Sequence, residues 1–177
     1  MPCALPARWG WKLSAAARNK PYQHIVYIGL GSNIEPERYL PLAVQLLRQR
    51  SQVSAVSSAW TSPPICHEGP DFLNAAAKLF TPNSVDELKA KVLRPIEAEL
   101  DRRRGPDKFV PRTIDLDVLI FDERELHADI WRYAYLAVPI AEIYPDYRQF
   151  PLEKNLTEIS ESLRYSQPIQ RVPLPLD

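Results

Sequence analysis

The chain has 177 residues, the length of one ordinary domain, and 45% of them are hydrophobic, which is enough to build a substantial core. Its 22 lysine and arginine residues balance 22 aspartate and glutamate residues, so charge does not favour broad binding to nucleic acid or to an anionic membrane. No stretch approaches the roughly 18 uninterrupted apolar residues of a membrane span. Two cysteines, Cys3 and Cys66, are too few for a disulfide framework, and we interpret them as free thiols in a reducing cytoplasm.

The first 22 residues carry scattered basic and small side chains. They lack the continuous apolar core of 7 to 15 residues that a signal peptide needs. We therefore expect residues 1–22 to form a flexible N-terminal extension.

The first half of the folded region predicts three strands and one helix. Residues 24–30 are β-branched and aromatic, and turn chemistry at residues 31–33 ends this first strand. Apolar residues at helical spacing then predict a helix over residues 40–50. Residues 53–60 and 72–80 predict a second and a third strand, which can pair antiparallel.

A second helix begins at a capping box, in which Ser84 and Glu87 stand three residues apart. One apolar face follows at helical spacing, made by Val85, Leu88, Val92, Ile96 and Leu100. Pro95 removes a hydrogen bond inside this helix and predicts a kink. We expect the helix to end near residues 102–105 and a fourth strand to span residues 113–121.

The resulting order β-α-β-β-α-β resembles the ferredoxin-like arrangement, an α+β sandwich. The folded domain is expected over residues 23–150, followed by a C-terminal tail over residues 151–177. After the fourth strand the pattern weakens, with a short strand expected at residues 136–140 and a short amphipathic helix at residues 156–163. Near the C-terminus, three prolines favour irregular structure; they are Pro168, Pro173 and Pro175.

Asp115 and Asp117 are the most informative pair, because alternate side chains of a strand share one face. Two carboxylates this close repel unless a positive group lies between them. Mg²⁺ fits, since it takes one or two carboxylates together with water and phosphate oxygens. The alternative is that both aspartates pair with arginines on a solvated face, because Asp-x-Asp alone is common.

Arginines stand on both sides of the loop that precedes this strand. Arg102, Arg103 and Arg104 are expected to close the second helix, and Arg112 enters the strand. Their guanidinium groups can converge beside the aspartates and stabilise phosphate charge. The alternative is an ordinary cationic helix C-terminus.

Phe72 and Asn74 share a strand face and offer an aromatic platform and an amide to a flat heterocycle. The alternative is a core role for Phe72 and a turn or ladder role for Asn74. Residues 29–31 form only a Gly-x-Gly fragment, which we interpret as turn geometry. Three histidines without ligand spacing are interpreted as ordinary surface or core residues: His24, His67 and His127.

Taken together, an ordered set of segments over about residues 24–147 resembles the 6-hydroxymethyl-7,8-dihydropterin pyrophosphokinase family of folate biosynthesis. The most distinctive of them is Pro-Arg-Thr-Ile-Asp-Leu-Asp at residues 111–117. The others are Gly-Leu-Gly-Ser-Asn (29–33), Ser-Pro-Pro (62–64), Asp-Phe-Leu-Asn (71–74), Ile-Glu (96–97) and Arg-Arg-Arg (102–104).

The resemblance implies a ferredoxin-like fold and transfer of the β,γ-diphosphate of ATP to the pterin hydroxymethyl oxygen, leaving AMP. It implies that Asp115 and Asp117 hold two Mg²⁺ ions. Arg102 and Arg112 match arginines that act on the phosphates and favour loop closure, and Arg104 matches a further arginine of a mobile loop. We expect that loop at residues 103–111.

The resemblance also implies a pterin site. Phe72 matches one of two aromatic rings that sandwich the pterin, and Tyr135 is the best match for the second ring. Asn74 matches a hydrogen-bonding position. Ser62 and Ile65 match pocket positions where the backbone contributes.

The nucleotide half departs from the family pattern. Glu97 matches a nucleotide-site position, but residues 125–132 are too short to reproduce the Val-Pro-His segment of the family. Arg132 could replace the arginine of that segment. Phe109 stands where a family tryptophan is common.

Three alternatives to the pyrophosphokinase follow. The chain could be a divergent paralogue that uses another pterin or nucleotide, or a pterin-binding relative without turnover. An RNA-binding module is disfavoured, because no Lys/Arg-Gly-Phe/Tyr pattern occurs and the net charge is zero. We therefore expect ATP and a hydroxymethyl dihydropterin as substrates, no nucleic acid or membrane partner, a cytoplasmic location, and a monomer or homodimer.

Overall fold

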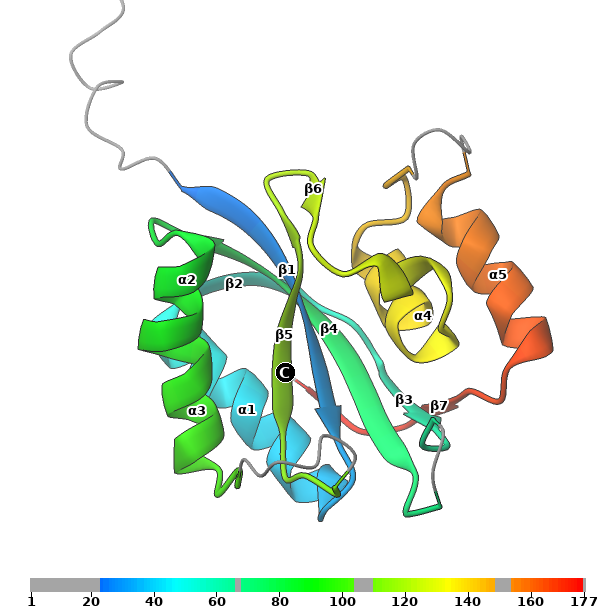
Figure 1. The fold of residues 1–177 in the computed structure, drawn as a ribbon, viewed down its shortest axis with the longest axis horizontal. Helices are drawn as coiled ribbons and strands as arrows, with labels where there is room; N and C mark the ends of the chain where they lie inside the picture. The colour runs from blue at the N-terminus through cyan, green and yellow to red at the C-terminus, as the bar shows by residue number, and fades with distance from the viewer. Residues whose placement is uncertain (1–22, 66–67, 104–109, 149–153, 177) are drawn as a thin grey trace, which may run out of the picture.

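A computed structural model of the chain describes residues 23–65, 68–103, 110–148 and 154–176 (Figure 1). Several expectations fall outside these ranges. They concern the extension over residues 1–22, both cysteines, His67, Arg104, Phe109 and most of the expected loop at 103–111. All of these stay predictions.

An antiparallel sheet forms the centre of the molecule, with strand order β6-β5-β1-β4-β3-β7 and with β2 also paired to β4. The inner strands β1 and β4 are fully paired from His24↔Thr81 to Ser32↔Leu73. The strand bounds are β1 His24–Ser32, β2 Gln52–Val56, β3 Ala59–Ser62, β4 Phe72–Thr81, β5 Asp115–Phe121, β6 Arg124–Glu125 and β7 Gln170–Val172. The expected β-α-β-β-α-β order is confirmed, with one strand divided in two.

The divided strand is the one expected over residues 53–60. Its ladder is interrupted at Ser57, whose backbone N–H donates to the Ala76 carbonyl oxygen at 2.8 Å. The Ser57 hydroxyl oxygen in turn accepts from the Ala76 N–H, also at 2.8 Å. A side chain therefore replaces one backbone acceptor, which separates β2 from β3 while both remain paired with β4.

Helices cover both faces of the sheet (Figure 1). The largest buried cluster joins one sheet face to helices α1 (Pro36–Arg50), α2 (Val85–Leu88) and α3 (Arg94–Glu99) and to the π-helix η2 (Lys89–Leu93). A second cluster joins the other face to the 3₁₀-helix η3 (Ala128–Trp131) and to helices α4 (Ala134–Ile143) and α5 (Leu156–Ser166).

The second expected helix begins as predicted, with the Ser84–Glu87 capping box present. It is then interrupted by η2, which ends at Leu93, two residues before Pro95, a residue that has no N–H to continue the α-helical ladder. The predicted end at residues 102–105 is wrong, because α3 ends at Glu99 and Asp101 has a left-handed φ of 60°. Arg102 and Arg103 therefore follow the helix and do not form a cationic last turn.

The strand expected at residues 136–140 is wrong, because this segment lies in α4. The helix packs between β4 and α5, so apolar residues are needed all around it. A short apolar run with no alternation does not distinguish a buried strand from a buried helix.

The C-terminal tail is more ordered than its prolines suggest. The expected short helix is confirmed as α5, with an Asn155–Glu158 capping box. Strand β7 then pairs with β3, and Leu176 is buried in the larger core cluster. The expectation of an irregular C-terminal end is therefore wrong for residues 170–172, which form a strand.

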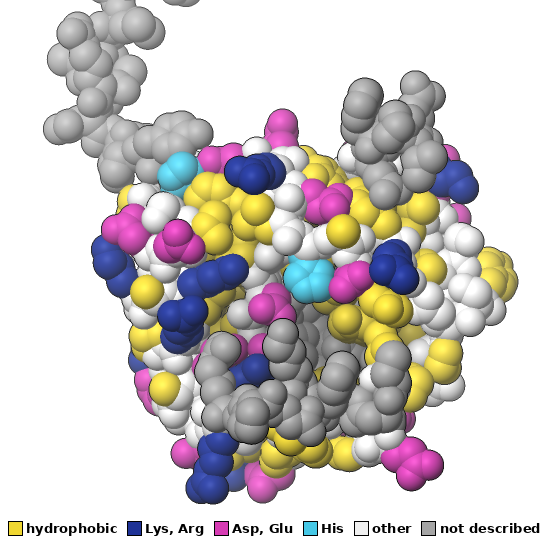
Figure 2. All heavy atoms as spheres, viewed as in Figure 1, with side chains coloured by type: hydrophobic (Ala, Val, Ile, Leu, Met, Phe, Trp, Pro, Cys, Tyr) yellow, Lys and Arg dark blue, Asp and Glu magenta, His cyan; other side chains and the backbone are white. Residues whose placement is uncertain are grey.

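Side chains of both charges are interspersed over the face of the molecule in Figure 2, in keeping with the balanced composition. Within the described ranges, no helix combines the length and apolarity required to cross a bilayer.

Candidate active site

A pocket of about 250 Å³ opens between the sheet and the first turn of α4. It lies on the α4 side of the sheet, because alternate residues of β1 pack into the opposite core, among them Val26 and Ile28. The intervening residues on the pocket side are Gly29 and Gly31. Because glycine has no side chain, these two positions leave open a part of the pocket that any larger residue would occupy.

One half of the pocket is aromatic and amide-lined. Phe72, Asn74, Ser62, Ile65 and Tyr135 all contribute to its wall. The structure thus brings together the two residues that the strand pattern assigned to a flat heterocycle and the three that the family resemblance added. The Asn74 amide is held in place, since its Nδ2 donates to the Ser62 hydroxyl oxygen at 3.0 Å and to the Trp60 carbonyl oxygen at 3.4 Å. Its Oδ1 lies 3.5 Å from where a Cβ on Gly31 would stand.

Tyr135 belongs to the first turn of α4 and stacks on Tyr133 with 5.6 Å between ring centroids. Burial, and to a smaller extent the negative charge of Asp129, raise the pKa of Tyr135 to about 12. Its hydroxyl is therefore protonated at neutral pH, and the ring remains a neutral stacking surface.

The other half of the pocket is charged. Asp115 and Asp117 both line it, while Leu116 and Val118 are buried in the larger core on the opposite face of β5. The alternation predicted for this strand is confirmed.

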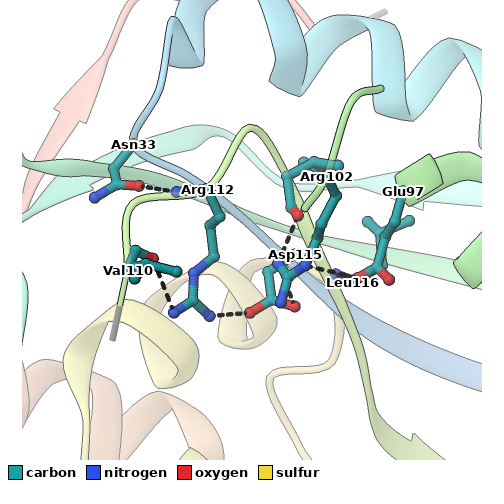
Figure 3. Close-up of polar contacts among 8 residues, drawn as sticks. Asn33, Glu97, Arg102, Val110, Arg112, Asp115 and Leu116 are labelled. Atoms are coloured by element: carbon teal, nitrogen blue, oxygen red, sulfur yellow. Dashed lines mark hydrogen bonds and ion pairs between the residues drawn. The ribbon is translucent and has the colours of Figure 1, made fainter. Parts of the chain in front are cut away.

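Two arginines converge on Asp115 (Figure 3). Arg102 Nη1 lies 2.8 Å from Asp115 Oδ1, and Arg112 Nη1 lies 2.5 Å from Asp115 Oδ2. Pairing with arginines was the alternative to metal binding, and it holds for Asp115 in this structure.

Backbone contacts fix these two arginines. The Arg112 N–H donates to Asn33 Oδ1 at 2.7 Å, and its carbonyl oxygen accepts from the Asn33 N–H at 3.1 Å (Figure 3). Arg102 Nη1 also donates to the Ile114 carbonyl oxygen at 2.6 Å. Asn33, directly after β1, thus holds the Arg112 backbone, and Ile114, directly before β5, holds the Arg102 guanidinium group.

Asp117 differs from Asp115 electrostatically. Although its side chain stays partly exposed, desolvation by the pocket walls, together with the charge of Asp115, raises the pKa of Asp117. A cation between the two carboxylates would relieve both effects. Within the described ranges no group of three or more His, Cys, Asp or Glu side chains is placed to hold a metal. Two carboxylates fit Mg²⁺, which completes its shell with water and phosphate oxygens.

Two residues assigned to the nucleotide do not line the pocket. Glu97 is 2% exposed, and its Oε1 accepts from the Leu116 N–H at 3.1 Å, so it supports β5 from the core side (Figure 3). Arg132 is 70% exposed and its nearest carboxylate is Asp129, at 3.8 Å.

His127 does line the pocket, contrary to the expectation of an ordinary histidine. It stands directly before η3, where the segment after β6 turns back towards β5. Its positive charge, when present, lowers the pKa of Asp117. The sequence signal for this position was weak, because His127 has no ligand spacing and residues 125–132 are too short to reproduce the Val-Pro-His segment of the family.

Comparisons with known proteins show the family of the chain. Residues 27–145 match the sequence profile described as 7,8-dihydro-6-hydroxymethylpterin-pyrophosphokinase (HPPK). The 2-amino-4-hydroxy-6-hydroxymethyldihydropteridine pyrophosphokinase of Bacillus subtilis is 36% identical over 132 residues, which cover 68% of this chain and 78% of that protein. The Pseudomonas aeruginosa protein of the same name is 32% identical over 161 residues, covering 84% and 96% respectively.

Solved structures show the same fold. A Plasmodium falciparum HPPK-DHPS triple mutant with SDX-DHP aligns with a TM-score of 0.62 at 10% identity, over 81% of this chain and 45% of that one. This chain thus spans less than half of the longer protein, and at this identity the likeness concerns the fold alone. The expected ferredoxin-like α+β fold is confirmed. With a profile match over more than half of its length and these relatives, the chain belongs to the HPPK family.

Proposed function

We propose that this chain transfers the β,γ-diphosphate of ATP to the hydroxymethyl group of 6-hydroxymethyl-7,8-dihydropterin, giving AMP and the pterin diphosphate in folate biosynthesis. One observation carries the proposal. A single pocket joins an aromatic and amide-lined half to a half that contains two carboxylates and an arginine. This is the arrangement needed to hold a flat heterocycle beside a phosphate chain.

The pterin half supplies stacking and orientation. We assign Phe72 and Tyr135 to the two faces of the ring, because both line the pocket from different elements, β4 and α4. Asn74 is the hydrogen-bonding group. Its amide is already oriented by Ser62, so little conformational entropy is lost when the ligand binds.

The phosphate half supplies charge. Asp115 and Asp117 would hold Mg²⁺, which when bound neutralises phosphate charge and favours in-line transfer. Arg112 already projects into the pocket and can contact phosphate oxygens. Arg102 fixes Asp115, and both arginines can shift part of their contact to the phosphates once the carboxylate has a metal partner.

The chemistry follows from positioning. The pterin hydroxyl oxygen attacks the β-phosphorus while the bond to the α-phosphate oxygen breaks, and the hydroxyl proton passes to solvent or to a neighbouring oxygen. Holding the two substrates in line supplies most of the acceleration, so no strong base is required.

A coupled assay of AMP release, with and without the hydroxymethyl pterin, tests this proposal. AMP should form when ATP, Mg²⁺ and the pterin are all present. Release of AMP with only a different pterin or nucleotide would indicate a divergent paralogue. Tight pterin binding without AMP would indicate a relative without turnover. A cytoplasmic location and a monomeric or homodimeric state stay predictions.

Gly31→Ala is expected to weaken binding of the pterin by about tenfold, because the new methyl group enters the pocket between Asn74 and Phe72, where one methyl is worth roughly 1–3 kcal/mol. Its contacts, at 3.5 and 3.8 Å, are ordinary, so the melting temperature should change little.

Gly29→Ala is the comparison for stability alone, since its methyl group would stand only 3.2 Å from Leu119 Cδ1 and should lower the melting temperature. Titration calorimetry and thermal melting of both variants measure the two effects. Unchanged pterin affinity in Gly31→Ala would place the pterin elsewhere.

A further inference from the structure

Residues 167–170, which join α5 to the start of β7, contact two elements that carry walls of the pocket, α4 and β3, although they lie beyond the residues that match the family profile. At the start of this segment, Gln167 reaches the first turn of α4, which carries Tyr135. Three residues later, Gln170 pairs with Thr61, the neighbour of Ser62 in β3. Strand β3 in turn pairs with β4 at Ser62↔Phe72.

The contact at α4 consists of two hydrogen bonds. Gln167 Oε1 accepts from the Ala134 N–H at 2.8 Å, and Gln167 Nε2 donates to the Arg132 carbonyl oxygen at 2.7 Å. The two backbone partners also fix the orientation of the amide, because one is a donor and the other an acceptor.

The side-chain amide of Gln167 acts as the N-terminal cap that α4 lacks. The residue at the N-cap of α4 is Tyr133, which offers no side-chain cap to the helix. The first N–H groups of any helix have no intrahelical partner, and Gln167 satisfies the one at Ala134, directly before Tyr135. The bond therefore acts on the backbone that sets the direction of the Tyr135 side chain.

We propose that Gln167 is a positioning residue for the pterin slot, holding the first turn of α4 so that the Tyr135 ring faces the wall formed by Phe72 and Asn74. This inference rests on the proposed function. Gln167 acts through Tyr135 and does not touch the substrate, since it is absent from the pocket lining. The C-terminal segment thereby connects both walls of the slot to one another.

Gln167→Met keeps the length of the side chain and removes both hydrogen bonds. We expect the dissociation constant for 6-hydroxymethyl-7,8-dihydropterin, measured by calorimetry, to rise about tenfold. Affinity for a non-hydrolysable ATP analogue should stay within about twofold of wild type. The KM for the pterin should rise while kcat at saturating pterin changes little, a pattern that general destabilisation does not produce.

Asn155→Ala is the matched control, because it removes a cap at the opposite end of α5, where Asn155 Oδ1 accepts from the Glu158 N–H. It should lower the melting temperature without changing pterin affinity. If both variants weaken the pterin equally, the effect of Gln167 is only structural and the inference is overturned.

A double-mutant cycle tests the route of the effect. In a Tyr135→Ala background, Gln167→Met should have no further effect on pterin affinity, and full additivity would overturn the inference. Should Gln167→Met fail to fold, Gln167→Glu retains the acceptor for Ala134 and replaces the donor, and must itself weaken the pterin. A wild-type chain that binds no pterin would overturn the proposed function as well. If the wild type binds the pterin and the Gln167 variants bind it with the same affinity, only the positioning role of Gln167 is overturned.

Discussion

Asp117→Asn is expected to reduce diphosphoryl transfer by about a thousandfold or more, with no loss of folding stability. The substitution removes a carboxylate proposed to hold Mg²⁺, and metal neutralisation of phosphate charge is worth several kcal/mol. It also removes a charge that partial desolvation in the pocket and the Asp115 carboxylate disfavour, while the exposed part of the side chain keeps this effect small, so the free energy of unfolding should be equal or only slightly higher. Activity assays and urea denaturation of the same preparation measure both.

The difference in stability between Asp117→Asn and the wild type should depend on pH in one direction. The pKa of Asp117 is raised in the folded state, so the wild type loses stability as pH rises through the folded pKa. The advantage of Asp117→Asn should therefore be present at pH 7 and vanish below the ordinary pKa of 3.8. An advantage that grows as the pH falls would contradict the raised pKa.

Asp115→Asn should differ in its effect on stability, although we expect it to abolish activity as well. Asp115 is the shared partner of Arg102 and Arg112, whose side chains are 12% and 19% exposed. Neutralising it leaves two largely buried guanidinium groups without that carboxylate, which should lower stability by about 1–3 kcal/mol. Asp86→Asn, at an exposed position of α2, is the control for the substitution itself. Equal stability of the two active-site variants would contradict the arginine pairing.

Glu97→Leu is expected to lower the free energy of unfolding by about 3 kcal/mol or more. The buried carboxylate accepts from the Leu116 N–H, and its Oε1 lies 3.9 Å from Arg102 Nε, so its loss affects a strand and a cation together. Chemical denaturation of the purified variant gives the value.

Glu97→Gln separates support of the fold from contact with the nucleotide. It keeps an acceptor for Leu116 and should be destabilised by only about 1 kcal/mol, with ATP affinity close to wild type. A variant of normal stability that loses ATP affinity would instead place Glu97 in the nucleotide site.

Local rules were sufficient for much of the fold and of the site. Strand alternation placed Asp115 and Asp117 on one face, and the capping box at Ser84 marked where α2 begins. These signals depend on neighbours within a few residues. For the same reason Phe72 and Asn74 could be assigned to one surface before the structure was known.

Features that depend on distant partners could not be predicted in this way. Segment 136–140 is helical because α5 and β4 enclose it, and β7 is a strand because β3 offers an open edge. His127 reaches the pocket through the path of the chain after β6, and Gln167 contacts α4 across 33 residues. None of these contacts leaves a periodic or motif-like trace in the sequence.

The most direct test of the central claim is ³¹P NMR of the full chain incubated with ATP, Mg²⁺ and 6-hydroxymethyl-7,8-dihydropterin. The wild type should form AMP and a pterin diphosphate ester in equal amounts, and Asp117→Asn should form neither. Formation of ADP with a pterin monophosphate, or equal product from wild type and Asp117→Asn, would contradict the central claim.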